Sequence, residues 1–254
     1  MIYKEFSPSI ELKNIVNNYW VFDVGGKNAS KYPLQHETIP DSCVSIVLIN
    51  QPYYQGVRIL GPHSKKYHQA IFPNSIFFGV KISPWLIMKP ALFDKQKLIN
   101  KTSEAEEHLS EYFNDLFHKG TITKSFSIPL VETKLVKLFN SLEIQQNDLV
   151  KFICTELLKK KSIATITNEI PSSIRVIQKT FKSVVGLTMK QYANNLRMRQ
   201  VWKDLLNAQG CKLDIILNHD YYDQAHFINE FKNKMKRSHN DYESYLKKIN
   251  ISLI

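Results

Sequence analysis

Two stripes of polar side chains in the second half of the chain have the chemistry to contact nucleic acid. The first consists of Arg175, Gln178, Lys179 and Lys182, which follow the i, i+3, i+4, i+7 spacing of one helix face. Arg and Gln can form paired hydrogen bonds with base edges, whereas Lys is suited to phosphates. The alternative is a polar helix face that meets only solvent.

The second stripe belongs to an internal repeat with an offset of 50 residues. Ser173 and Asp223 are both residue types that cap helix N-termini, and each precedes an apolar i, i+4 pair that predicts one buried face. The polar side of the second helix carries Gln224, His226, Asn229 and Asn233, with Lys232 and Lys236 at its edges. We therefore expect two equivalent units, each offering one polar helix face.

A shorter apolar segment and a tight turn precede each of these helices. The segments contain Ile163, Ile166 and Ile170 in the first unit, and Leu213, Ile216 and Leu217 in the second. Helix, short turn and helix, repeated twice, is the pattern of two helix-turn-helix units.

Residues 188–207, between the two units, contain neither Gly nor Pro, which predicts a helix about 30 Å long. Successive major grooves on one side of DNA are roughly 34 Å apart, so this helix could hold both units at adjacent grooves. Its apolar residues form two overlapping stripes, which suggests that each stripe contacts one unit. The first stripe is Met189, Tyr192, Ala193 and Leu196, and the second is Met198, Val201, Trp202 and Leu205.

The charge distribution agrees with a polyanionic partner. The 254 residues carry 34 Lys and Arg against 23 Asp and Glu, a formal net charge of +11. Residues 147–254 hold 18 basic and 10 acidic residues, so most of the excess lies with the repeat. Three distant cysteines, Cys43, Cys154 and Cys211, are typical of a reducing compartment, and no run approaches the about 20 apolar residues that cross a bilayer.

The first half of the chain has the pattern of a small β domain. Short β-rich runs at 19–24, 43–49, 57–60 and 76–82 alternate with Gly, Pro and Asn turn signals, which predicts a sandwich or barrel. We expect an opening helix near 9–18 that packs on this domain.

Two amphipathic helices follow the β-rich runs. Their apolar stripes extend from Leu109 to Phe117 and from Val131 to Leu142, and they either pack on their own domain or form a homodimer seam. A Ser103–Glu106 capping box starts the first helix and Gly120 ends it. Residues 143–148 have the polarity of a short linker.

Residues suited to metal binding or catalysis are scattered. His36, His63 and His68 fit no metal-ligand spacing, which favours surface or hydrogen-bonded histidines. The acids Asp23, Glu37 and Asp41 have no evident partner, and no nucleophile elbow or phosphate-binding glycine loop occurs. We predict that the protein is not an enzyme and needs no metal or cofactor.

Aromatic residues of the β-rich part could line a pocket for a small molecule, although such residues are usually core. They are Tyr19, Trp20, Tyr53, Tyr54 and Trp85.

Several runs near 149–248 match one family of DNA-binding proteins. They are Ile177 to Lys182, Val185 to Thr188, Tyr192, Leu196-Arg197, Leu205, Tyr221 to Phe227, Glu230 to Lys232 and Tyr242. With these residues the C-terminal region resembles the AraC/XylS family of bacterial transcriptional regulators. The resemblance implies two helix-turn-helix units joined by a long helix. Residues 39–42 and 79–84 are similar to the β-rich domain ahead of some such regulators.

By position, this resemblance implies DNA-contacting residues in both units. The base-reading candidates are Arg175, Gln178 and Lys179 in the first unit and Gln224, Ala225 and Asn229 in the second, where Ala225 could meet only a thymine methyl. Ser173, Lys182, His226 and Lys232 complete the predicted set, with His226 near the phosphate backbone.

The sequence departs from the family pattern at several positions. Thr167 and Ile216 replace the usual alanines, Pro171 and Asp220 replace turn glycines, and Lys236 to His239 replaces Gly-x-Ser-Pro. These departures concentrate in the second unit, which could therefore contact only the DNA backbone.

We predict an α+β protein with a β-rich sensor or dimerisation domain at 1–120, a helical linker at 121–148 and a double helix-turn-helix domain at 149–254. The expected function is sequence-specific binding of double-stranded DNA in the cytoplasm and nucleoid. The expected partners also include a small-molecule effector in the N-terminal domain, RNA polymerase if transcription is activated, and a second copy of the chain. One alternative is a ligand-binding or enzymatic β-barrel whose helical tail has lost sequence-specific DNA binding. Another is a protein-interaction regulator that pairs through 103–142 and has no specific affinity for DNA.

Overall fold

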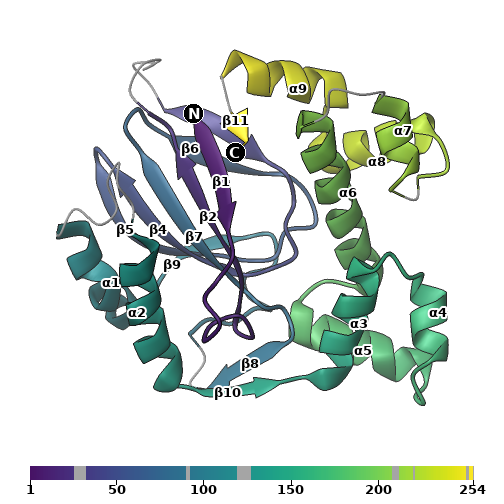
Figure 1. Cartoon of the computed structure of the whole chain (residues 1–254), viewed down its shortest axis with the longest axis horizontal. Coiled ribbons are helices and arrows are strands. Elements are labelled where there is room, and N and C mark those ends of the chain that lie inside the picture. The colour runs from purple at the N-terminus through teal and green to yellow at the C-terminus, as the bar shows by residue number, and fades with distance from the viewer. Residues whose placement is uncertain are drawn as a thin grey trace.

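The computed structural model describes residues 1–25, 33–89, 92–118, 127–207, 212–219, 221–249 and 252–253. A β-rich part comes first and a set of helices follows, so the α+β class is confirmed (Figure 1). The two parts lie side by side, with the long helix α6 (Met189–Asn207) next to the sheet. No described helix is long and apolar enough to cross a membrane.

The β-rich part is built on a seven-stranded sheet with the order β11-β1-β2-β7-β4-β5-β9. The predicted β-rich runs are confirmed as four of these strands, β2 (Val16–Asp23), β4 (Ser45–Gln51), β5 (Tyr54–Leu60) and β7 (Ile76–Ile82). The other three strands are β1 (Ile2–Phe6), β9 (Thr102–Glu104) and β11 (Ser252–Leu253). Because β11 pairs in parallel with β1, the last described residues extend the sheet formed by the first (Figure 1).

Alternating side chains of the central strands fill two hydrophobic layers. Ile46 and Leu48 of β4 pack with Phe78 of β7 in the larger core, whereas Val47 and Ile49 point to the opposite face. That opposite face is covered by a separate two-stranded antiparallel sheet of β3 (Leu34–Thr38) and β6 (Tyr67–Ile71).

Helices α1 (Glu107–His118) and α2 (Ile128–Asn140) cover the other face of the sheet. The apolar stripes predicted for 109–117 and 131–142 are buried against the sheet, apart from partly buried Tyr112 and Leu142 at their margins. They therefore pack within their own chain, and the homodimer seam proposed for these stripes is wrong.

Two local predictions in the β-rich part are also wrong. Residues 10–15 form turns and β2 starts at Val16, because the β-branched and aromatic residues after it pair with β1 and β7. Ser103 lies in β9 opposite Ile59 and cannot cap α1, which begins at Glu107. Gly120 lies outside the described residues.

The predicted linker at 143–148 contains a strand. β10 (Glu143–Gln146) pairs with β8 (Leu86–Lys89) in a two-stranded ladder. Only Ile144 of β10 packs against the core, so its other residues can be polar while their backbone is paired.

The C-terminal part contains seven helices in the described residues, from α3 (Asp148–Leu158) to α9 (His239–Lys248). The first helix-turn-helix consists of α4 (Ile163–Asn168) and α5 (Ile174–Val185). The second consists of α7 (Lys212–Leu217) and α8 (Gln224–Met235). Helix α6 runs from one unit to the other, as predicted (Figure 1).

Candidate nucleic-acid interface

The first recognition helix, α5, begins with a side-chain cap and buries one face. The Ser173 hydroxyl accepts a hydrogen bond from the Val176 amide at 3.4 Å. Ile177 and Phe181 are fully buried in a core shared with α3 and α6. The predicted polar stripe lies on the open side, where Arg175, Gln178, Lys179 and Lys182 are all exposed.

The second recognition helix, α8, has the same design. The Asp223 carboxylate accepts a hydrogen bond from the His226 amide at 2.7 Å, and Phe227 and Phe231 are fully buried. The five predicted contact residues of this helix are exposed, and they are Gln224, Ala225, His226, Asn229 and Lys232.

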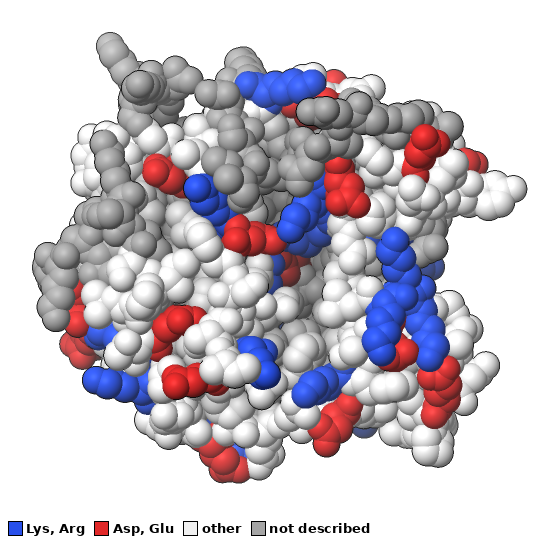
Figure 2. All heavy atoms as spheres, in the orientation of Figure 1, with Lys and Arg blue, Asp and Glu red and all other residues white. Residues whose placement is uncertain are grey.

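Side-chain charge on α5 is entirely positive, because the helix contains no acidic residue. Among the described residues, none has a carboxylate within ion-pair distance of Arg175, Lys179 or Lys182. These cations are therefore open to an external anion. The charge on α5 contrasts with the face of the molecule drawn in Figure 2, where acidic and basic side chains are intermixed.

One apolar residue of α5 was misplaced by the sequence pattern. Ile174 precedes Ile177 and Phe181 by three and seven residues, a spacing that predicts a place in the same buried stripe, but Ile174 is 55% exposed. It precedes the first buried position by one turn, and the core begins only at Ile177. Val176 is 52% exposed on the other side of Arg175.

Helix α6 connects the two units through the two predicted stripes. Met189 and Tyr192 pack in the core of the first unit, while Met198, Val201 and Trp202 pack in the core of the second. Thr188 and Gln191 form a reciprocal capping box at the start of the helix. A helix of 19 residues spans about 28 Å, so the units sit at the two ends of a rigid rod.

The β-rich part also holds the C-terminal end of α5. The Lys95 ammonium donates to the backbone oxygens of Pro84, Leu86 and Val184 at 3.0, 2.8 and 3.2 Å. The Gln96 amide donates to the oxygens of Lys182 and Ser183 at 3.1 and 2.9 Å. These two side chains, which we call the α5 clamp, supply donors to the last carbonyls of α5, of which the Lys182 oxygen also accepts from the Gly186 amide. Burial lowers the Lys95 pKa to about 8.

The second unit is attached to the β-rich part through different elements. Asn195 of α6 donates to the Ser42 hydroxyl at 2.9 Å and to the His63 carbonyl at 2.7 Å, and it accepts from Lys234 of α8. On α9, the Tyr242 hydroxyl donates to the Glu37 carbonyl at 2.8 Å. All of these groups are half-buried or buried, so the second unit and the β-rich part share one interface.

A cavity of about 670 Å³ lies between the seven-stranded sheet, the β3–β6 sheet and helices α6 and α9. Figure 2 shows a hollow on the same side of the molecule, bordered by acidic and basic side chains. Trp20, Phe22 and Phe77 line it from the sheet, and Trp202 and Leu246 line it from the helices. Of the five aromatic residues suggested as pocket lining, Trp20 is the one that borders this cavity.

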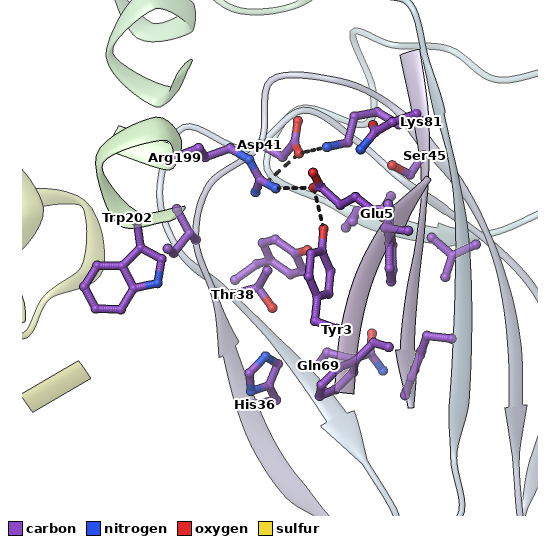
Figure 3. A pocket seen from close by; sticks show the side chains of 18 of the residues that line it. Tyr3, Glu5, His36, Thr38, Asp41, Ser45, Gln69, Lys81, Arg199 and Trp202 are labelled. Atoms are coloured by element: carbon purple, nitrogen blue, oxygen red, sulfur yellow. Dashed lines mark hydrogen bonds and ion pairs between the residues drawn. The ribbon is translucent and has the colours of Figure 1, made fainter. Parts of the chain in front are cut away.

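One end of the cavity holds a network of paired charges (Figure 3). Asp41 accepts from Lys81 at 2.7 Å and lies 3.4 Å from Arg199 of α6. Glu5 lies 3.7 Å from Arg199 and accepts from the Tyr3 hydroxyl at 2.9 Å. Burial alone would raise the Asp41 pKa, but Lys81 and Arg199 outweigh it and hold that pKa below its ordinary value.

His36 borders the opposite end of the cavity (Figure 3). Its Nδ1 is 2.9 Å from the Tyr245 hydroxyl of α9, and its ring stacks on Phe22. Burial lowers the His36 pKa to about 4, against the opposing effect of Glu37, so the ring is neutral at pH 7. His63 bonds the Gly61 carbonyl, and His68 is exposed. No group of three metal-ligand side chains occurs in the described part of the chain.

Glu37 and Asp41, for which the sequence indicates no partner, both have cationic partners in the structure. Glu37 lies 3.0 Å from Lys66 and 3.4 Å from Arg237, and Asp41 has the two cations described above. Their partners are distant in sequence, so no local spacing could have revealed them. The α5 clamp was missed for the same reason.

Comparisons with known proteins identify a matching domain and two similar transcription factors. Residues 4–104 match the model of a domain of unknown function, DUF6597. The chain is 32% identical over 88 residues to the probable transcription factor PqrA of Proteus vulgaris. The matched stretch covers 34% of this chain and 72% of PqrA. It is 21% identical over 207 residues to the HTH-type transcriptional activator RhaS of Enterobacter sp. (strain 638), covering 80% of this chain and 69% of RhaS.

Among solved structures, an apo variant of ToxT from Vibrio cholerae matches with a TM-score of 0.47 and 12% identity, covering 88% of this chain and 96% of ToxT. Unsaturated fatty acid-bound wild-type ToxT matches with a TM-score of 0.46 and 15% identity, covering 87% and 92%.

The fold and the sequence relatives together define the class of protein. A β-rich domain followed by two helix-turn-helix units joined by one long helix is the organisation of a DNA-binding transcriptional regulator. The identity to PqrA across most of that protein is decisive for the family. The chain belongs to the AraC/XylS family of transcriptional regulators.

Proposed function

We propose that the two recognition helices bind adjacent major grooves in a sequence-specific manner. In the first unit Arg175, Gln178 and Lys179 contact bases, and Ser173 and Lys182 contact the backbone. In the second unit Gln224, Ala225 and Asn229 face bases, and His226 and Lys232 lie near phosphates. The exposure of all ten residues on two capped helices, with the opposite helix faces buried, supports this proposal best.

Two single substitutions in α5 test the division between base and backbone contacts. Arg175→Ala should relax the base preference at one position, because a paired hydrogen bond to a base edge is lost. Lys182→Ala should weaken specific and random DNA alike and lower the salt dependence, because one phosphate contact is lost. Equal losses on specific and random DNA for Arg175→Ala would contradict its assignment.

The cavity is the proposed site for a small-molecule effector. Its volume lies in the range of ligand pockets, and its walls come from both the β-rich part and the second unit. DNA affinity can be measured with the small-molecule fraction of a cell lysate, for the wild type and for Val47→Phe, which places a ring in the cavity. A change in the wild type alone supports the site, and the same response in both contradicts it.

The proposed domain division remains 1–120, 121–148 and 149–254. RNA polymerase is the further partner if the protein activates transcription. A homodimer would need a surface other than the buried stripes of α1 and α2.

A further inference from the structure

Two apolar side chains are exposed to solvent at the start of the first recognition helix. Ile174 and Val176 are 55% and 52% exposed, and they are the first and third residues of α5. Successive residues of a helix are about 100° apart, so these two side chains flank Arg175 on either side. Together the three residues form an apolar–cationic–apolar edge at the N-terminal end of the helix.

Folding does not account for this choice of residues. The core contacts of α5 begin at Ile177, and Ile174 and Val176 belong to none of the described hydrophobic clusters. β-Branched residues are also poorer helix formers than Ala, Lys or Glu. A soluble helix would lose nothing by having polar residues at both positions.

The position of these side chains points to bases. In a helix-turn-helix protein the N-terminal residues of the recognition helix come closest to the base edges in the major groove. The positively charged side chains beside them, Arg175 and Lys179, have no acidic partner among the described residues and favour an anionic polymer. In the major groove the apolar group on a base edge is the C5-methyl of thymine.

We propose that Ile174 and Val176 are specificity-determining residues that contact thymine methyl groups on either side of the base read by Arg175. This inference rests on the proposed DNA-binding function. It assigns the first unit a preference for thymine at the positions flanking that base.

The second unit has the reverse arrangement at the equivalent positions. Gln224 and His226 occupy the places of Ile174 and Val176, and Ala225 occupies the place of Arg175. All three are exposed. Two polar flanks around a small apolar centre can hold at most a central methyl contact, so the flanking methyl contacts belong to the first unit alone.

Removing single methyl groups from the DNA tests the proposal. The full-length protein first selects its site from a random duplex pool, and each dT of that site is then replaced by dU, which lacks only the methyl. We expect about fourfold weaker binding at one or two positions in the first half-site, as for one methyl-sized group returned to water. Ile174→Ser and Val176→Ser should each reduce the dT/dU affinity ratio to about one at one position, because serine carries no methyl group.

Leu217→Ser is the matched control, because Leu217 is 43% exposed on α7, outside both recognition helices, and its replacement should leave every dT/dU ratio unchanged. Equal binding of dT and dU at all positions, with base preference still relaxed by Arg175→Ala, would overturn this inference and leave the proposed function standing. A methyl effect that persists in both variants would overturn it as well. Enrichment of no sequence at all would contradict both.

Discussion

The two helix-turn-helix units share one plan and differ in how it is completed. Both recognition helices have a side-chain N-cap and two fully buried apolar residues at the same repeat positions. At the C-terminal end the first unit has Gly186, with φ of +91°, whereas the second has Lys236, with φ of +55°. The left-handed conformation is easy for glycine and costly for lysine, so the second unit ends its helix with strain.

The units also differ in how the β-rich part holds them. The first recognition helix is held by the α5 clamp, Lys95 and Gln96. The second unit is held by α6 and α9, which also form the wall of the cavity. Among the described residues, none of α4 or α5 lines that cavity. A molecule bound there would therefore contact α6 and α9 directly and the first recognition helix not at all.

The largest expected effect comes from breaking the charge network at the cavity. Asp41→Asn leaves Lys81, which is 7% exposed, with a neutral partner. Loss of one member of a buried ion pair should lower the free energy of unfolding by about 3 kcal/mol. Urea denaturation measures the loss, and exposed Asp94→Asn, which should cost under about 0.5 kcal/mol, is the control. Equal costs for the two variants would show that the network does not stabilise the interface.

Acid should loosen the second unit through His36. Its pKa is lowered from 6.5 to about 4, so between these values the unfolded chain binds a proton that the folded chain does not. Stability therefore falls as the pH drops through this range, by at most about 3 kcal/mol. His36→Gln should flatten the curve of unfolding free energy against pH between 6.5 and 4. An unchanged slope in the variant would assign the acid sensitivity to another group.

Removing the α5 clamp should affect the first unit selectively. Lys95→Met leaves the carbonyls of Pro84, Leu86 and Val184 without their donor, which should cost about 2 kcal/mol. Amide hydrogen exchange should accelerate in residues 174–185 and stay unchanged in 224–235. Lys97→Met, on the same loop and 85% exposed, is the control. Equal acceleration in both recognition helices would contradict independent attachment.

Exchanging the residues at the two helix ends gives the smallest effect. Lys236→Gly should raise the free energy of unfolding by about 0.5–1 kcal/mol, because the left-handed backbone no longer carries a side chain. Gly186→Ala should lower it by about 1 kcal/mol or more, since the added Cβ would also lie 3.2 Å from Pro62. Thermal unfolding of both variants checks the pair, and shifts of the same sign would contradict the comparison.

The sequence was most informative where structure depends on local spacing. The caps at Ser173 and Asp223, the buried Phe181 and Phe231 and the two stripes of α6 follow from residue types a few positions apart. The helix expected near 9–18, which rested on serine residues that could cap its N-terminus, was wrong because the strand residues after Val16 pair with β1 and β7. The cavity network and the α5 clamp join residues more than 80 positions apart, such as Lys95 and Val184 or Asp41 and Arg199, which no local pattern encodes.

The most direct test of the account is selection of bound sequences from a random DNA pool at physiological salt with the full-length protein. Two units held about 28 Å apart by α6 should enrich two elements roughly 10 base pairs apart, with flanking thymines in one of them. A single enriched element would show that the second unit contacts only the backbone. Enrichment of no sequence, with weak and salt-sensitive binding, would contradict sequence-specific recognition by this chain.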